Sequence, residues 1–147
     1  MTTDTIDQQL VKLLGQDARQ SAEQLAKQLN IGAATVRRKI RKLIQNDSLH
    51  IVGIVDPAHF GLPLGVVITL DVSPDKLEST SDELSEQQEI KWLVTTTGRY
   101  DIIAGARFSS LDDLSVFNSN VIAKLDGVKN SEIFIVLGTS KGLVRLT

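Results

Sequence analysis

Residues 21–45 carry the sequence SAEQLAKQLNIGAATVRRKIRKLIQ, which predicts two short helices joined by a tight turn. Ser21 and Gln24 have the spacing of a capping box, in which each side chain satisfies a backbone amide at the start of a helix. Asn30-Ile31-Gly32 follows that helix as a three-residue turn containing glycine. A capped helix, a glycine-bearing turn and a second helix are typical of a helix-turn-helix.

The second of these helices, expected over about residues 33–45, is apolar on one side and basic on the other. The apolar sector contains Val36, Ile40, Leu43 and Ile44. At its start, Ala34 and Thr35 are small enough to let the backbone approach DNA. The opposite half contains the candidate DNA-contacting residues, which are Ala34, Thr35, Arg37, Arg38, Arg41 and Lys42.

The four basic candidates differ in their expected contacts. Arg37 and Arg38 lie near the start of the helix, and arginine can pair with guanine through two hydrogen bonds, so we expect them to reach base edges. Arg41 and Lys42 lie further along, and we expect them to neutralise phosphates. The alternative is a basic helix face that is only solvated.

The remainder of the N-terminal region supports a compact three-helix unit. Apolar residues at helical spacing predict a first helix, and they are Ile6, Leu10, Leu13 and Leu14. Residues 1–50 carry a net charge of +3, whereas the rest of the chain carries −5. A basic cluster on an otherwise acidic chain indicates a polyanionic partner for one element, here double-stranded DNA.

From residue 64 onward the pattern changes to strands and helices in alternation. Leu64, Val66, Ile68, Leu70 and Val72 alternate with smaller or polar residues, which predicts a strand. Further elements are expected as a helix over 73–88, strands over 90–97 and 102–108, a helix over 110–125 with an apolar face including Leu111, and a strand over 132–137. This βαββαβ order predicts a ferredoxin-like domain and an α+β fold class overall.

Leu49–Asp56 reads as an additional apolar strand, and Pro57 and Gly61 then mark a connection. We therefore expect a DNA-binding domain over residues 1–55, a linker over 56–63 and a second domain over 64–147. The sheet of that second domain would have helices on one face only. A second subunit is the simplest cover for the other face, because homodimers are the commonest oligomers.

The composition excludes several classes of site. The chain has no cysteine and two histidines, so we expect no disulfide and no structural zinc. Neither a secretory signal nor a membrane-spanning run is visible, which predicts a cytoplasmic protein. We find no catalytic arrangement and no glycine-rich phosphate loop, and we expect neither enzymatic activity nor a cofactor.

The order of several short motifs along the whole chain resembles the Lrp/AsnC family, the leucine-responsive or feast/famine regulators. In the N-terminal half these are Ile6-Asp7, Asp17-Ala18-Arg19, Leu25-Ala26, Val36-x-x-Lys-Ile40-x-x-Leu43 and Ile51-x-x-Ile54-x-Asp56-Pro57. In the C-terminal half they are Thr97-Gly98-Arg99-Tyr100-Asp101 and Leu125-Asp126-Gly127-Val128. The sequence departs from the family's usual Ser, Arg and Gly at Gly32, Lys39 and Asp47.

The resemblance implies a transcriptional regulator with a winged or plain helix-turn-helix. Its second domain would bind a small effector, often an amino acid, and form dimers that assemble further into tetramers or octamers. Carried over to this sequence, the effector-binding residues are Thr97, Gly98, Tyr100 and Asp101. Gly98 would expose its amide to a carboxylate, Asp101 would pair with an ammonium group, and Tyr100 would wall the pocket. An ordinary turn between two strands is the alternative for this segment.

Two other functions stay open at this point. The architecture also resembles the siroheme decarboxylases, enzymes that need basic groups and histidines in the second domain. His50 and His59 lie in or beside the linker instead, which favours a DNA-binding role. A regulator that has lost its effector response, and acts as an architectural DNA-binding protein, is the other possibility.

Overall fold

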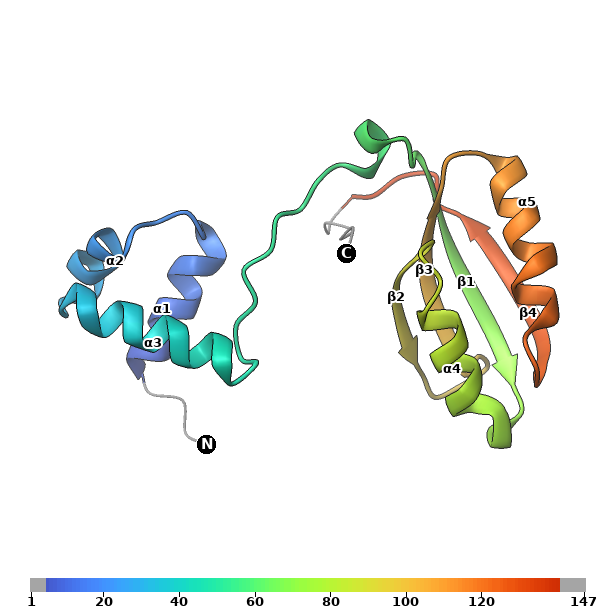
Figure 1. Ribbon diagram of the computed structural model, residues 1–147, viewed down its shortest axis with the longest axis horizontal. Coiled ribbons are helices and arrows are strands. Elements are labelled where there is room, and N and C mark those ends of the chain that lie inside the picture. The colour runs from blue at the N-terminus through green and yellow to red at the C-terminus, as the bar shows by residue number, and fades with distance from the viewer. Residues whose placement is uncertain (1–4, 141–147) are drawn as a thin grey trace. The chain divides into compact units, whose positions relative to one another are not determined.

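The computed structural model describes residues 5–140, which form two compact units. The first unit ends at Gly53 and the second begins at Ile54, ahead of the expected linker over 56–63 (Figure 1). No helix in the described range is long and apolar enough to cross a membrane.

The N-terminal unit is the expected group of three helices packed around one small core. Its central side chains are Leu10, Leu25 and Val36, each fully buried. One comes from each helix, so the three helices share a single core. The helices are α1 (Thr5–Gln16), α2 (Ala22–Leu29) and α3 (Ala33–Gln45).

Local interactions fix the two ends of α2, the first of them as the sequence predicts. The Ser21 hydroxyl accepts from the amide of Gln24, and the Gln24 side chain accepts from the amide of Ser21, which completes the capping box. At the other end of α2, Asn30 adopts the left-handed conformation with φ 53°. Asparagine tolerates this conformation better than most residues, which allows the chain to turn sharply into α3.

The expected strand over Leu49–Asp56 is wrong, because the segment is extended but unpaired. A strand is stabilised by a hydrogen-bonded neighbour, and the described residues provide none for this segment. Four of its apolar side chains are exposed: Ile51, Val52, Ile54 and Val55. The expected linker that follows contains a short 3-10 helix, Pro57–Phe60, which the carboxylate of Asp56 caps by accepting from the amide of Ala58.

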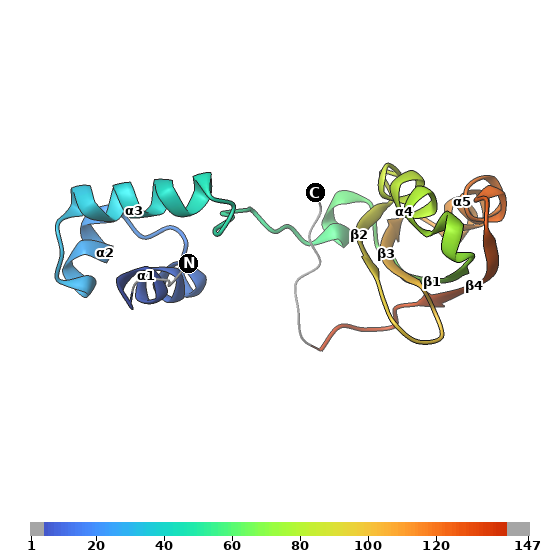
Figure 2. The same cartoon turned by 90° about the horizontal axis from the view of Figure 1, so that it is seen from below.

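The C-terminal unit has the predicted βαββαβ topology. Its four antiparallel strands lie in the order β2-β3-β1-β4. Figure 2 shows both longer helices on the same side of the sheet. The elements are β1 (Leu64–Val72), a 3-10 turn (Pro74–Lys76), α4 (Leu77–Ser85), β2 (Ile90–Thr95), β3 (Ile102–Phe108), α5 (Leu111–Asn120), a 3-10 turn (Ile122–Lys124) and β4 (Val128–Ile135).

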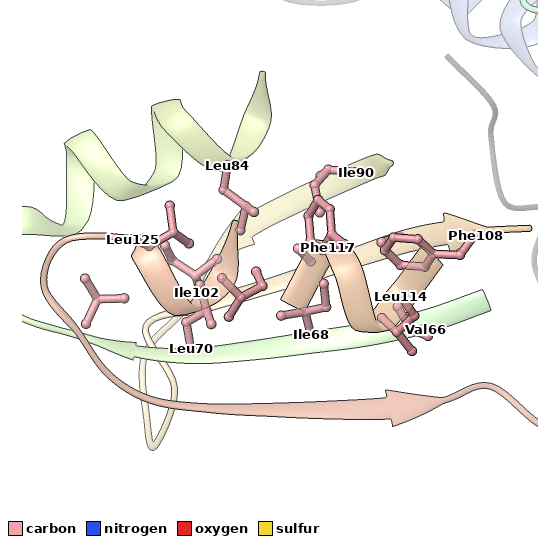
Figure 3. Close-up of a cluster of buried hydrophobic side chains, with 14 residues drawn as sticks. Val66, Ile68, Leu70, Leu84, Ile90, Ile102, Phe108, Leu114, Phe117 and Leu125 are labelled. Atoms are coloured by element: carbon pink, nitrogen blue, oxygen red, sulfur yellow. The ribbon is translucent and has the colours of Figure 1, made fainter. Parts of the chain in front are cut away.

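Alternation along the strands places the larger core between the sheet and its two helices. Ile68 and Leu70 of β1 and Ile102 of β3 are fully buried there. Figure 3 shows these strand side chains facing Leu84 of α4 and Phe117 of α5. Phe117 also packs edge-on against Phe108, with ring centroids 5.2 Å apart, a geometry that aromatic rings prefer.

No helix within residues 54–140 of this unit covers the opposite face of the sheet. Trp92 of β2 lies across Gly105 of β3, its partner in the strand register. The guanidinium of Arg107 similarly lies over Gly65 of β1. Each glycine makes room for a large side chain that lies flat on the sheet. We call this surface the uncovered face; its exposed apolar side chains include Trp92, Val94 and Phe134.

Several predicted details of the elements differ from the structure. Ile44, expected in the core stripe of α3, is 47% exposed, whereas its neighbour Leu43 packs against the core. Ile44 lies about 80° around the helix from the buried Val36, at the edge of the apolar stripe. Leu111, expected on the apolar face of α5, is 61% exposed as the first residue of that helix. Three elements also differ from their expected ranges. The helix expected to residue 88 ends at Ser85, the strand expected to residue 97 ends at Thr95, and the last strand, expected over 132–137, runs over Val128–Ile135.

We predict that Gly105→Ala displaces Trp92 from the sheet. A Cβ at this position would lie 2.1 Å from the indole Nε1, so the ring must move. Because Trp92 is the chain's single tryptophan, its fluorescence should shift to longer wavelength, and the free energy of unfolding should fall by about 1–3 kcal/mol. The matched control is Gly138→Ala, which meets nothing within 4 Å. Unchanged emission and stability in Gly105→Ala would contradict this packing.

Candidate functional site

The outward side of α3 presents three cations to solvent. Arg38, Arg41 and Lys42 are all exposed, and within residues 5–140 none of them takes part in an ion pair. They follow one another at helical spacing, so their charges point to the same side of the helix. An uncompensated row of this kind is suited to contact a polyanion.

The inward side of α3 is fastened by packing and by a partly buried ion pair. Val36 is fully buried against the other two helices. The ammonium of Lys39 lies 2.8 Å from a carboxylate oxygen of Asp7 in α1, and the two side chains are only 20% and 21% exposed. These contacts hold α3 in one orientation, and the exposed cations are therefore presented on a rigid support.

The remaining basic candidate, Arg37, already has a partner. Its guanidinium donates to the carboxylate of Glu23 in the first turn of α2, across the helix-turn-helix corner. Both side chains are more than half exposed. Arg37 is therefore the one basic candidate whose charge is compensated inside the unit, among the residues that the structure describes.

The start of α3 is open. Gly32 occupies the N-cap position and provides no side-chain hydrogen bond, unlike Ser21 at the start of α2. Ala34 is exposed and Thr35 is half-buried beside this end. The amide of Thr35 donates to the carbonyl of Gly32, and no side chain caps the amides of Ala33 and Ala34. Small residues at this end permit close approach of another molecule.

The predicted effector residues lie in the loop between β2 and β3, and they divide into two groups. Thr97 and Gly98 are exposed at its tip, where Gly98 has φ 116°. Asp101 instead folds back onto β1. Its amide donates to the carbonyl of Leu70 at 2.9 Å, and its carboxylate Oδ2 accepts from the amide of Val72 at 2.8 Å.

Tyr100 reaches from the same loop to β4. Its hydroxyl donates to the carboxylate of Glu132, which also accepts from Arg99 at 3.1 Å. The Arg99 guanidinium lies over the Tyr100 ring, 5.1 Å from its centroid. The hydrogen bond to Glu132, followed by burial, raises the pKa of Tyr100 above its ordinary value. Glu132 pairs in register with Thr69, so this cluster lies on the uncovered face.

Sequence reasoning missed Glu23, Asp7 and Glu132. The first two left no local signal, because their partners lie in a different helix. Glu132 did leave one: it is the only acidic residue within the otherwise apolar run that predicted the last strand.

The two histidines lie in side-chain pairs, His50 with Asp47 at 3.3 Å and His59 with Asp56 at 3.1 Å. All four residues are exposed. The described residues contain no group of three or more histidine, aspartate or glutamate side chains positioned to hold a metal ion.

Comparison with known proteins assigns each half of the chain. The model of the AsnC-type helix-turn-helix domain matches residues 4–44, and that of the Lrp/AsnC ligand binding domain matches residues 65–144. Relatives include the HTH-type transcriptional regulator Ptr1 of Methanocaldococcus jannaschii, 30% identical over 141 residues and covering 94% of each chain. An HTH-type transcriptional regulator of Pyrococcus furiosus is 28% identical over 139 residues, again with 94% of each chain covered.

Solved structures show the same fold along the whole chain. E. coli AsnC superimposes with a TM-score of 0.86 at 26% identity, covering 97% of each chain. A transcriptional regulator from Neisseria meningitidis, solved in complex with L-Met, has a TM-score of 0.86 at 19% identity, covering 99% of this chain and 97% of that one. The relatives are transcriptional regulators and not enzymes. This chain belongs to the Lrp/AsnC family and is a DNA-binding transcriptional regulator.

Proposed function

We propose that the outer face of α3 reads an operator in the major groove, with Arg38 at base edges and Arg41 and Lys42 at phosphates. The observation that supports this is the row of three exposed cations that form no ion pair with any described residue, on a helix held from behind by Val36 and the Lys39–Asp7 pair. The N-terminal residues of a recognition helix approach the bases most closely. Ala34 and Thr35 at the open start of α3 would permit that approach. The protein would bind its operator in the cytoplasm.

A homodimer would present two such helices to DNA. The uncovered face bears Trp92, Val94 and Phe134, and a second copy would bury these apolar side chains against its own. Two recognition helices related by a two-fold axis fit a nearly palindromic operator whose half-sites lie about one helical turn apart. Further assembly of dimers into tetramers or octamers would bring several operators together.

We also propose that the loop over residues 96–101 contributes to the binding of an amino acid or a similar small effector. The exposed amide of Gly98 could receive a carboxylate, with Thr97 beside it. Since Val72 uses Oδ2 of Asp101, Oδ1 is the atom that would meet an ammonium group. Tyr100 would contribute by exchanging its bond to Glu132 for a contact with the ligand. Regulation requires that the effector bind unequally to two arrangements of the assembly.

Two substitutions test the DNA-reading surface. Arg38→Ala should lower the ratio of operator to random-duplex affinity by about fivefold to 150-fold, because it removes a base contact. Lys42→Ala should weaken binding to both duplexes and reduce the slope of log affinity against log salt by about 0.9 for each phosphate that is no longer neutralised. Binding titrations at several salt concentrations measure both. If Arg38→Ala weakens binding to the two duplexes equally, Arg38 does not read bases.

The effector contact is tested with Asp101→Asn. The amide oxygen can still accept from the Val72 amide, so the loop stays in place while the charge is removed. Calorimetric titration with each amino acid identifies the ligand of the unmodified protein, and its affinity should fall at least about tenfold in Asp101→Asn. Asp112→Asn, which removes the same charge from the exposed first turn of α5, is the matched control.

Unchanged affinity in Asp101→Asn would show that this residue does not hold the ammonium group. If no amino acid binds the unmodified protein or alters its DNA affinity, the protein is an effector-independent architectural DNA binder instead.

A further inference from the structure

Within residues 5–140, ion pairs tie α3 both to α1 and to α2, and they differ in burial. Lys39 and Asp7 are about four-fifths buried, so their pair belongs to the packed interior of the unit. Arg37 and Glu23 are 56% and 59% exposed. An exposed pair adds little to stability, because water and salt screen it. The Arg37–Glu23 pair is therefore not required to hold the helices together.

The consequence of this pair is electrostatic. Arg37 lies beside the cations of the DNA-reading surface, yet the Glu23 carboxylate compensates its charge. Affinity for any duplex grows with the number of phosphates that a protein neutralises, regardless of sequence. Because Arg37 is paired with Glu23, each subunit has one cation fewer with which to neutralise phosphates.

Compensation of the charge does not remove the donors of Arg37. A guanidinium carries five N–H donors, and Glu23 accepts from Nη2. Other N–H groups are left to donate to the O6 and N7 atoms of a guanine. Arg37 held in this way would gain little from phosphates at random sites, but could still gain from a correctly placed base.

From these observations we infer that Glu23 is a specificity-determining residue of this regulator. Its ion pair keeps Arg37 from neutralising a phosphate and thereby lowers the affinity for DNA of random sequence. This inference rests on the proposed DNA-reading face of α3. Glu23 acts here through Arg37 and needs no contact of its own with DNA.

The test compares Glu23→Gln with the unmodified full-length protein on two duplexes of equal length, one from the region upstream of its own gene and one with that sequence shuffled. Released from its partner, Arg37 should add a phosphate contact. Affinity for the shuffled duplex should therefore rise about threefold to tenfold, with a salt dependence steeper by about 0.9 per subunit bound. The ratio of upstream to shuffled affinity should fall accordingly.

Two further variants separate this mechanism from a general effect of charge. Glu78→Gln changes the net charge equally but lies in α4 of the other unit. It should therefore alter neither the ratio of upstream to shuffled affinity nor the salt dependence of binding. In an Arg37→Gln background, Glu23→Gln should raise both affinities together and leave ratio and slope unchanged. Thermal unfolding followed by circular dichroism verifies that each variant is folded.

The inference is overturned if Glu23→Gln has the selectivity and salt slope of the unmodified protein, or if its effect on them persists without Arg37. The proposed DNA-reading face has its own outcome in the same titrations. If Arg38→Ala and Lys42→Ala behave as predicted and Glu23→Gln does not, only the role of Glu23 is wrong. If the unmodified protein binds neither duplex, both proposals fail.

Discussion

The alternation of side chains along β1 is the constraint on which the C-terminal unit depends. Ile68 and Leu70 are fully buried beneath the two helices, and their neighbours in sequence therefore emerge on the other side of the same strand. A βαββαβ chain places both helices on one side, so its topology leaves that second side uncovered. The glycines at 65 and 105 then leave room for Arg107 and Trp92 on this surface, which is partly apolar.

The N-terminal unit solves a different problem with few residues. A recognition helix must be held firmly and still present most of its surface. Among the described residues, the fully buried Val36, the partly buried Ile40 and Leu43 and the Lys39–Asp7 ion pair anchor α3. Most of the remaining side chains on α3 are thereby left for solvent or a partner. Glu23 then sets how much positive charge this surface presents.

The sequence predicts those features that depend on neighbours within one turn or one strand. The capping box at Ser21, the helix start at Ser110 and the alternation along β1 are of this kind, and all are confirmed. Individual side-chain pairs between distant residues were missed, and the one strand that lacks a partner was wrongly predicted. Glu23 lies 14 residues from Arg37, and Tyr100 lies 32 from Glu132. The apolar run over Leu49–Asp56 has the composition of a strand, but pairing decides whether a strand forms.

The loop over residues 96–101 connects the end of β1 with the uncovered face of the sheet. Asp101 fastens the loop to the end of β1, and Tyr100 fastens it to Glu132 on the uncovered face. An effector bound by these side chains has to compete with their present partners. Its binding would then change the hydrogen bonding of the face that we propose a second subunit covers. The effector would then bind with different free energies to assemblies that differ in the contact between subunits. Coupling between two sites requires such an unequal affinity.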